Sequence, residues 1–399
     1  MKPPARIAIN EALWVRGESI STTQRNGISE TKALTARGAK IFLLKSARDQ
    51  DGLARLKKIL WQSDVHVILS WLQPAELNAL LPLLRERKNF SLLNDDWWLQ
   101  PYWFMREAEY LMFRKYHGIA VRLGLSEFLS GGQPPWLLDP RPDLASYTLF
   151  GALLRPAALA VSPVMELWQH WQRRGEVINP KRLVYFPFAI DPANVPLSQE
   201  KPQYDFSNTG GTCGIWLMRD AYAPFHHSFA NLYADRKRLT DAIAAHAGNP
   251  FTFYDCRNFR KNSAQISYAE YLQKNQQSRF LIASGGLHDS TVPKFLEYAC
   301  VGTPMIGRGL PFDYPWLDDC LFPVEMLAAR PENIKPLLHQ ALEAYPKLRE
   351  NCLNWRDRLL QLYSLENLLD LLQAQIDGQA IPADYLKNPV RATGLSETH

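Results

Sequence analysis

Short apolar segments alternate with amphipathic segments along most of the chain, and this alternation limits the possible folds more than any other feature. In the first half, strand-like runs are predicted at residues 5–10, 40–44, 65–70 and 90–94. Helical patterns separate them, at residues 28–37, 53–61 and 74–87. The runs are continuously apolar rather than alternating, which is typical of strands buried on both faces of a parallel sheet.

The same pattern begins again in the second half of the chain. Strands at 159–163 and 184–190 end the first half, and residues 191–203 are polar and contain three prolines, as a linker does. Further strands are predicted at residues 204–208, 251–254, 280–283 and 304–307. The helices predicted between and after them are 235–246, 268–277, 291–300, 331–363 with breaks near Pro336 and Pro346, and 365–376.

A chain of 399 residues is long for a single hydrophobic core, so two domains are expected. The predicted fold class is α/β, with a Rossmann-like arrangement in each half. The predicted division is an N-terminal domain over 1–190, a linker over 191–203, a C-terminal domain over 204–364, and a closing helix and tail over 365–399.

Charge is unevenly distributed between the two halves. Residues 1–190 carry 25 Lys and Arg against 17 Asp and Glu, whereas residues 191–399 carry 20 against 23. A net charge of +8 on the first half suits an anionic acceptor or an acidic membrane surface, but no nucleic-acid motif accompanies it, so no nucleic-acid partner is expected. The apolar runs are too short to span a bilayer and the N-terminus lacks a signal-peptide core. These features predict a cytoplasmic protein, with peripheral contact at the inner face of the membrane left open.

The five cysteines are scattered and include no C-x-x-C pair, which argues against a disulfide framework and a zinc knuckle. No G-x-S-x-G motif occurs, and the first predicted strand is not followed by G-x-G-x-x-G. No structural metal is expected.

Residues 284–307 hold the candidate chemistry. A glycine loop joins the strand at 280–283 to the helix at 291–300, and Gly302 can end that helix. Asp289 lies at the helix start and Glu297 about two turns further on, while the free N–H groups between them can bind an anion. The alternative is an ordinary βαβ unit with two solvated acids.

The run from Glu297 to Ile306, Glu-Tyr-Ala-Cys-Val-Gly-Thr-Pro-Met-Ile, resembles the end of the acidic-x7-Glu signature of retaining GT-B glycosyltransferases of the "group 1" type. The resemblance covers about 25 residues and implies a GT-B architecture, in which two Rossmann-like domains face a central cleft. It implies that Glu297 binds a ribose and that Asp289 contacts the donor sugar. The first acid is Asp instead of the usual Glu.

The resemblance also implies donor contacts around these acids. The loop with Gly285, Gly286 and His288 would contact the sugar, and the backbone of Ser290, Thr291 and Val292 would bind the diphosphate. Lys294 lies on the same helical face as Glu297 and is a further donor-binding candidate. Gly210 and Gly211 follow the first strand of the second half and would let the backbone approach the diphosphate, although a plain tight turn is an equal alternative.

Transfer of a sugar from a nucleotide leaves negative charge on the departing diphosphate, so cationic side chains are expected near it. The candidates are Arg219, Arg236, Arg257, Arg260 and Lys261. Arg260 and Lys261 are favoured as catalytic groups because they closely follow the predicted strand at 251–254, and Arg257 is assigned to donor binding.

Candidates for the acceptor side lie in the first half, at Asn26, Gly27, Asp95, Trp97 and His117. Aromatic residues crowd the segment from 95 to 116, where they form either a core or a stacking wall for a sugar. Asp95 and Asp96 could alternatively hold a metal ion, as in GT-A glycosyltransferases, but such an enzyme would not need a second α/β unit.

The sequence therefore predicts transfer of a glycosyl unit from a UDP- or GDP-sugar, with retention of configuration and no required cofactor. The acceptor would be a glycan, a lipid-linked molecule or a small molecule. Two alternatives are a GT-B-like partner subunit that binds a sugar nucleotide or glycan without turnover, and a sugar-nucleotide epimerase. The epimerase would need a set of acidic and histidine residues that the sequence does not clearly offer.

Overall fold

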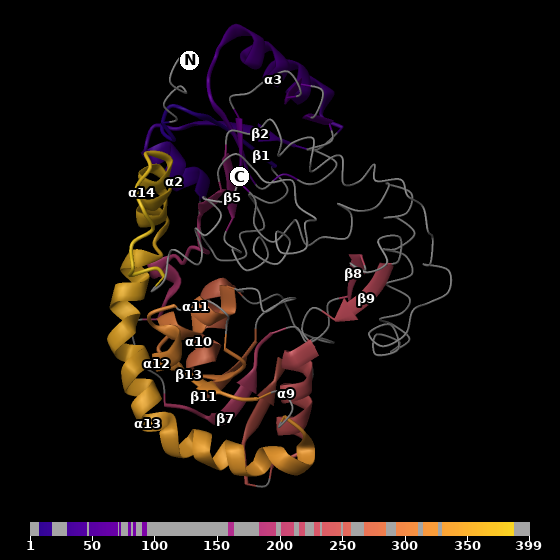
Figure 1. Ribbon diagram of the computed structural model, residues 1–399, viewed down its shortest axis with the longest axis vertical. Coiled ribbons are helices and arrows are strands. Elements are labelled where there is room, and N and C mark those ends of the chain that lie inside the picture. The colour runs from indigo at the N-terminus through magenta and orange to yellow at the C-terminus, as the bar shows by residue number, and fades with distance from the viewer. Residues whose placement is uncertain are drawn as a thin grey trace, which may run out of the picture.

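The computed structural model has two parallel β-sheets with helices packed against them (Figure 1). It describes residues 8–17, 30–45, 48–70, 72, 79–80, 83–84, 90–93, 159–162, 183–196, 201–210, 215–219, 227–231, 234–248, 250–256, 267–284, 293–309, 314–325 and 329–386. The α/β class predicted from the alternation of segments is confirmed.

The first sheet has six strands in the order β2-β1-β3-β4-β5-β6, and every neighbouring pair is parallel. Its strands are β1 (Leu13–Gly17), β2 (Lys40–Leu44), β3 (Val67–Ser70), β4 (Phe90–Leu93), β5 (Leu159–Ser162) and β6 (Leu183–Tyr185). Helices α2 (Glu30–Ala36) and α3 (Gln50–Gln62) belong to this unit. All four residues of β3 are buried, as expected for a central parallel strand.

The first strand was predicted in the wrong place. It occupies Leu13–Gly17 rather than residues 5–10. Leu13, Trp14 and Val15 are all buried and form the continuous apolar run that a central strand requires. Ile9 lies in a turn instead, where its carbonyl accepts a hydrogen bond of 2.9 Å from Trp14 Nε1.

The second sheet has five strands in the order β10-β7-β11-β12-β13, again all parallel. Its strands are β7 (Tyr204–Asn208), β10 (Phe253–Asp255), β11 (Ser278–Ala283), β12 (Met305–Gly307) and β13 (Leu321–Pro323). Its helices include α9 (Ala234–Ala244), α10 (Tyr268–Gln276), α11 (Pro293–Cys300) and α12 (Leu317–Cys320). The strands predicted at 204–208, 251–254, 280–283 and 304–307 match to within two residues, whereas α12 and β13 were not predicted.

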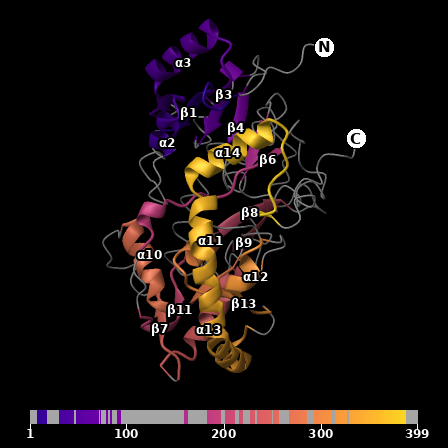
Figure 2. The same ribbon diagram turned by 90° about the vertical axis from the view of Figure 1, so that its left-hand side faces the viewer.

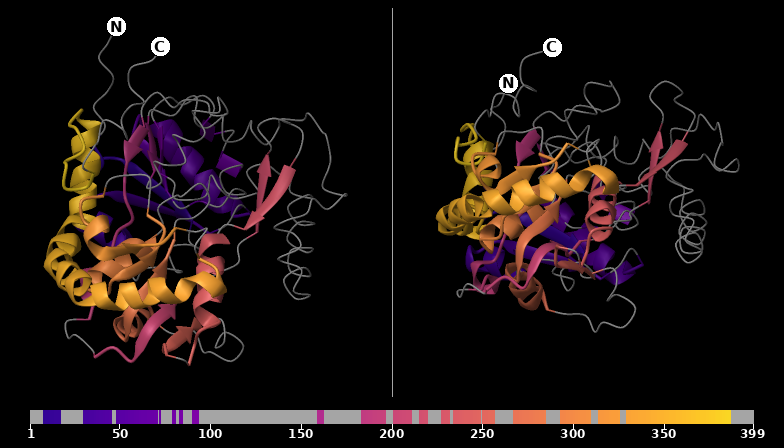
Figure 3. Two further views of the ribbon diagram at one scale, coloured as in Figure 1. Left: turned by 60° about the horizontal axis from the view of Figure 1, so that its bottom comes forward. Right: turned by 90° about the horizontal axis from the view of Figure 1, so that it is seen from below.

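An antiparallel hairpin interrupts the second unit between β7 and α9. Strands β8 (Ile215–Arg219) and β9 (His227–Asn231) form a two-stranded sheet of their own. Both views in Figure 3 show the hairpin standing apart from the two parallel sheets. The sequence analysis predicted only a glycine turn in this interval, so the hairpin is an addition to the regular βα connection.

Two helices lie towards the C-terminus of the described chain, α13 (Pro331–Leu362) and α14 (Leu365–Ile376). The predicted breaks near Pro336 and Pro346 are wrong, because α13 is one continuous helix of 32 residues that contains both prolines. It bends part-way along its length (Figure 1), as proline in a helix interior favours. Ile334, Leu338 and Ala341 of this helix are buried in the core of the second unit, and this packing holds the helix together across the prolines.

Helices α13 and α14 run along one side of the molecule from the second sheet to the first (Figure 2). The side-chain amide of Gln375 in α14 pairs with the backbone of Tyr185 in the edge strand β6. Tyr185 N–H donates to Gln375 Oε1 at 3.0 Å, and Gln375 Nε2 donates to the Tyr185 carbonyl at 2.7 Å. The amide therefore takes the place of a neighbouring strand beside Tyr185, in the last strand of the described sheet.

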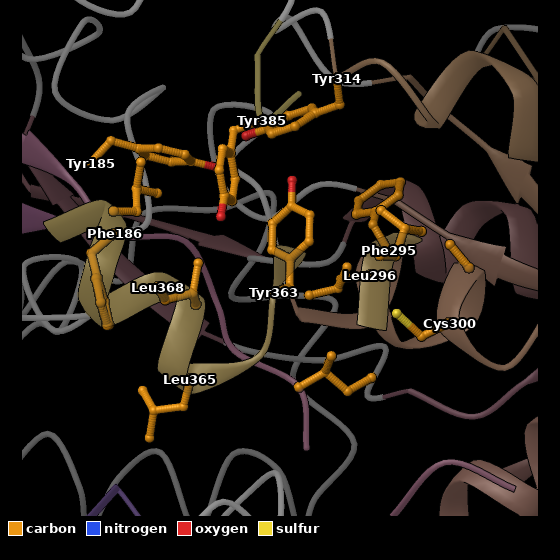
Figure 4. Close-up of a cluster of buried hydrophobic side chains, with 14 of the residues drawn as sticks. Tyr185, Phe186, Phe295, Leu296, Cys300, Tyr314, Tyr363, Leu365, Leu368 and Tyr385 are labelled. Atoms are coloured by element: carbon orange, nitrogen blue, oxygen red, sulfur yellow. The ribbon is translucent and has the colours of Figure 1, made fainter. Parts of the chain in front are cut away.

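One cluster of buried apolar side chains contains residues from both units. Tyr363, which links α13 to α14, lies between Tyr185 and Phe186 on one side and Phe295 and Leu296 on the other (Figure 4). The carbonyl of Tyr363 also accepts a hydrogen bond of 2.9 Å from Ile190 N–H. The two places where the described chain passes between the units are thus joined to each other.

Replacing Gln375 should destabilise the protein. Gln375→Ala leaves the buried N–H and carbonyl of Tyr185 without their partner, and we expect the free energy of unfolding to fall by about 2–4 kcal/mol. Urea unfolding followed by circular dichroism measures the change. Gln361→Ala, at an exposed position of α13, is the matched control and should alter stability by less than about 0.5 kcal/mol. Equal stability of the two variants would contradict the edge-pairing role.

Candidate functional site

The candidate site lies where β7 and β11 end. The chain passes from β7 to its neighbour β10 on one side of the sheet and then to β11 on the other. Ligands of parallel α/β sheets bind outside the carboxyl ends of the strands, at such a reversal of strand order. Thr209 and Gly210 follow β7 at this edge, and Ser284 follows β11.

Three helices of the second unit begin at this edge. Helices α10 and α11 directly follow the parallel strands β10 and β11, whereas α9 follows β7 after the hairpin of β8 and β9. Arg236 is the third residue of α9. Tyr268 and Tyr271 are the first and fourth residues of α10, which a capping box between Ser267 and Glu270 closes at its start. Lys294 and Glu297 are the second and fifth residues of α11. The free N–H groups at the start of a helix favour negative charge nearby. The side chains at this edge carry both charges: Arg236 and Lys294 are cationic, and Glu297 is acidic.

Glu297 is the buried carboxylate of the site, with only 6% of its surface exposed. Tyr268 donates a hydrogen bond to its Oε1 at 3.0 Å, and Tyr271 donates one to its Oε2 at 3.0 Å. A buried carboxylate needs such donors to offset its lost hydration. Two tyrosines of α10 therefore fix the position of both oxygens, and the carboxylate keeps capacity to accept further hydrogen bonds.

Lys294 is held over the same group of aromatic rings. Its Nζ donates to Tyr271 Oη at 2.7 Å and to the Thr209 carbonyl at 3.4 Å. The ammonium group also lies 4.6 Å from the ring centre of Tyr271 and 5.7 Å from that of Tyr298, within the range of cation–π attraction. These contacts direct the lysine towards the turn that follows β7.

Arg236 also lies beside that turn. It is 1% exposed, and its Nη2 donates to the Ser284 carbonyl at 3.2 Å. A Cβ atom added to Gly210 would lie 2.8 Å from Arg236 Nη1 and 3.0 Å from Lys294 Cε. Glycine is therefore what allows the two cationic side chains to approach the backbone of this turn so closely.

The turn itself is held by side-chain hydrogen bonds. Gly210 N–H donates to Asn208 Oδ1 at 3.1 Å, and Asn208 Nδ2 donates to Asp255 Oδ1 at 3.2 Å. The Thr209 hydroxyl lies 3.0 Å from the Tyr298 hydroxyl. The backbone beside the two cations is thus braced by neighbours from β10 and α11.

The structure describes five of the candidate residues and brings four of them together: Gly210, Arg236, Lys294 and Glu297. Arg219, the fifth, ends the hairpin strand β8. Their roles stay predictions. The other predicted residues lie outside the described part of the chain: Asp289, Arg260, Lys261, Gly211, Arg257, Gly285, Gly286, His288, Ser290, Thr291, Val292, Asn26, Gly27, Asp95, Trp97 and His117.

The sequence analysis missed the two tyrosines and did not single out Arg236 from its five cationic candidates. Tyr268 and Tyr271 were placed on a helix, but nothing assigned them to the site. Their spacing of three residues at a helix start, after a capping serine, puts both on one face at the ligand edge. This pattern is the feature of the sequence from which both tyrosines could have been assigned to the site.

Among the residues that the structure describes, no helix is long and apolar enough to cross a membrane. No group of three or more His, Cys, Asp or Glu side chains in that part of the chain is placed to hold a metal ion.

Several solved structures are similar to this chain over most of its length. Sucrose-phosphate synthase from Thermosynechococcus elongatus is similar with a TM-score of 0.51 at 10% identity, over 92% of this chain and 98% of that one. The trehalose-6-phosphate phosphatase N-terminal domain of Candida albicans gives 0.49 at 10% identity, over 94% and 98%. Anabaena HepE in complex with UDP and glucose gives 0.47 at 8% identity, over 92% and 99%.

The similarity to sucrose-phosphate synthase extends over almost the whole of both chains and shows the fold. Together with the two parallel sheets, it confirms the GT-B architecture predicted from the sequence. No protein-family model matches the chain, and a search of curated protein sequences finds no match.

The tyrosines around Glu297 should make the protein sensitive to alkali. Burial of their hydroxyls, and next the negative charge of Glu297, raise the pKa of Tyr268 and of Tyr271 above the ordinary value of 10.0. The unfolded chain loses these protons near pH 10 and the folded chain keeps them, so this stabilisation is present below pH 10 and is lost as the pH rises further. We expect the free energy of unfolding to decrease above about pH 10.

Urea unfolding between about pH 8 and 11.5 tests this. In Tyr271→Phe the free energy of unfolding should fall less steeply with pH than in the wild type. The difference in slope should be about 1.4 kcal/mol per pH unit, which corresponds to one proton. Absorbance at 295 nm separates exposed tyrosines, which ionise in the folded protein, from these two, which should ionise only on unfolding. Ionisation of every tyrosine near pH 10 without unfolding would contradict the prediction.

Proposed function

We propose that this protein is a glycosyltransferase that moves a sugar from a nucleoside-diphosphate sugar to an acceptor. The observation that carries the proposal is the convergence of Arg236 and Lys294 on Gly210, at the reversal of strand order in the second sheet. A GT-B fold alone does not define an activity, so the proposal rests on these residues. Two cations beside a glycine turn and three helix starts suit a diphosphate.

Each of these side chains would have its own role in the transfer of the sugar. Cleavage of the bond between the sugar and the diphosphate places negative charge on the departing oxygen, and Arg236 and Lys294 would stabilise that charge. Glu297, fixed by its two tyrosines, would accept hydrogen bonds from the ribose hydroxyls. Such positioned charges lower the barrier because they need no reorganisation during the reaction.

Finer points of the proposal come from the resemblance to group 1 enzymes. We infer retention of configuration, a UDP- or GDP-sugar as donor, and contact of Asp289 with the donor sugar. Arg260 and Lys261, which follow β10 in the sequence, remain proposed as further catalytic groups. The basic residues 1–190 would bind the acceptor across a cleft from residues 204–364, and the protein would act in the cytoplasm.

Nucleotide binding is the first test. UDP, GDP and their sugars are screened by thermal shift, and a ligand at 100 times its dissociation constant should stabilise the protein by roughly 2.7 kcal/mol. Gly210→Ala forces Arg236 and Lys294 to move, and we expect it to weaken diphosphate binding about tenfold or more. Gly309→Ala is the matched control, because its Cβ would meet only Leu321 Cδ2 at 3.9 Å. Absence of any nucleotide binding by the wild-type protein would overturn the proposed function.

Turnover is tested separately by release of the nucleoside diphosphate from the donor. Glu297→Ala and Asp289→Asn should each reduce transfer or donor hydrolysis below detection, since both acids are proposed to hold the donor. Glu350→Ala removes an exposed carboxylate of α13 and should leave the rate unchanged. Wild-type rates in both site variants would exclude the assigned roles. Nucleotide binding by the wild-type protein without any turnover would favour a non-catalytic partner subunit.

A further inference from the structure

We propose that Tyr271 is a positioning residue that keeps Lys294 and Glu297 from neutralising each other. The inference rests on the proposed function and deepens it. It explains how one site can offer a carboxylate and an ammonium group, not paired with each other, to different parts of one nucleotide. It concerns a tyrosine on α10, whereas both charged residues belong to α11.

Lys294 and Glu297 are three residues apart on one helix. Side chains of opposite charge at this spacing lie close enough to form an ion pair. Among the ion pairs of the described residues, none joins these two side chains. The Tyr271 hydroxyl lies between them instead, 2.7 Å from Lys294 Nζ and 3.0 Å from Glu297 Oε2.

The directions of the two hydrogen bonds follow from the groups themselves. An ammonium group can only donate and a carboxylate can only accept, so the Tyr271 oxygen accepts from Lys294 while its proton goes to Glu297. Burial and the charge of Glu297 raise the pKa of Tyr271, which keeps the proton in place at neutral pH. One neutral hydroxyl thereby satisfies both charges and separates them.

Tyr268 provides the internal comparison. It donates to Glu297 Oε1 at 3.0 Å, and its ring stacks on that of Tyr271 with centroids 5.8 Å apart. Among the described contacts, none links Tyr268 to Lys294. Loss of either hydroxyl removes one hydrogen bond from Glu297, but only loss of the Tyr271 hydroxyl lets Lys294 approach the carboxylate.

The experiment compares Tyr271→Phe with Tyr268→Phe. Dissociation constants are measured by calorimetry for UDP and uridine, and for GDP and guanosine, and the nucleoside value divided by the diphosphate value gives the contribution of the phosphates. In Tyr268→Phe both ligands should weaken together, so this ratio stays within about twofold of the wild type. In Tyr271→Phe, Lys294 pairs with Glu297, and the ratio should fall about tenfold.

A double-mutant cycle separates this role from a general structural one. In a Lys294→Met background, Tyr271→Phe should change the ratio by less than about twofold, because the lysine that it would release is absent. An additional tenfold loss in that background would overturn the proposal, as would an unchanged ratio in Tyr271→Phe alone. Failure of the wild-type protein to bind any of the four ligands would instead overturn the proposed function.

Tyr271→4-aminophenylalanine serves if the Phe variant does not fold. Its aromatic amine has the reach of the tyrosine hydroxyl and, when neutral, can donate to Glu297 and accept from Lys294, so the ratio at pH 8 should stay within about threefold of the wild type. Protonation of the amine removes the acceptor, and the ratio should fall on acidification in this variant by more than it does in the wild type. The same pH dependence in both proteins would overturn the proposal.

Discussion

Parallel pairing of the strands is the constraint on which the candidate site depends. Every strand of the second sheet runs in the same direction, so each connection returns through a helix and each helix starts at the same edge. Arg236, Tyr268 and Lys294 come from three different helices and meet only because of this rule. Charged and hydrogen-bonding side chains that are spread over about 60 residues of the sequence thus come together near Gly210, although no local sequence motif contains them all.

The same constraint explains why the two halves need each other. Parallel sheets are buried on both faces, and the edge strand β6 of the first sheet would otherwise expose its backbone. Gln375 of α14 pairs with the backbone of Tyr185 at that edge, and the buried cluster around Tyr363 contains residues from both units. The C-terminal helix therefore belongs to the first sheet by packing, although 180 residues of chain separate it from β6.

Much of this architecture could be predicted from the sequence, because continuous apolar runs have few alternatives to a buried parallel strand. The strands at 204–208 and 280–283 are examples. The first strand was misplaced because Ile9 and Leu13–Val15 are both apolar, and only tertiary packing decides which run enters the sheet. Because proline disfavours a helix interior, the sequence predicted that the helix would break at Pro336 and Pro346. Contacts with the hydrophobic core keep α13 continuous. For the site, Glu297 and Lys294 could be found from spacing, whereas the hydrogen bonds of Tyr268 and Tyr271 depend on how α10 packs against α11.

The hydrogen bond between Ile190 N–H and the Tyr363 carbonyl has a mechanical consequence. Two connecting segments that lie side by side resist twisting of the two units about the line that joins them far more than a single segment does. They still allow the units to bend towards each other. We infer that movement of the two sheet units relative to each other would bend at this pair of segments, as a hinge, rather than twist about it. A nucleotide held by the second unit would meet the first unit in the same orientation each time the two approach.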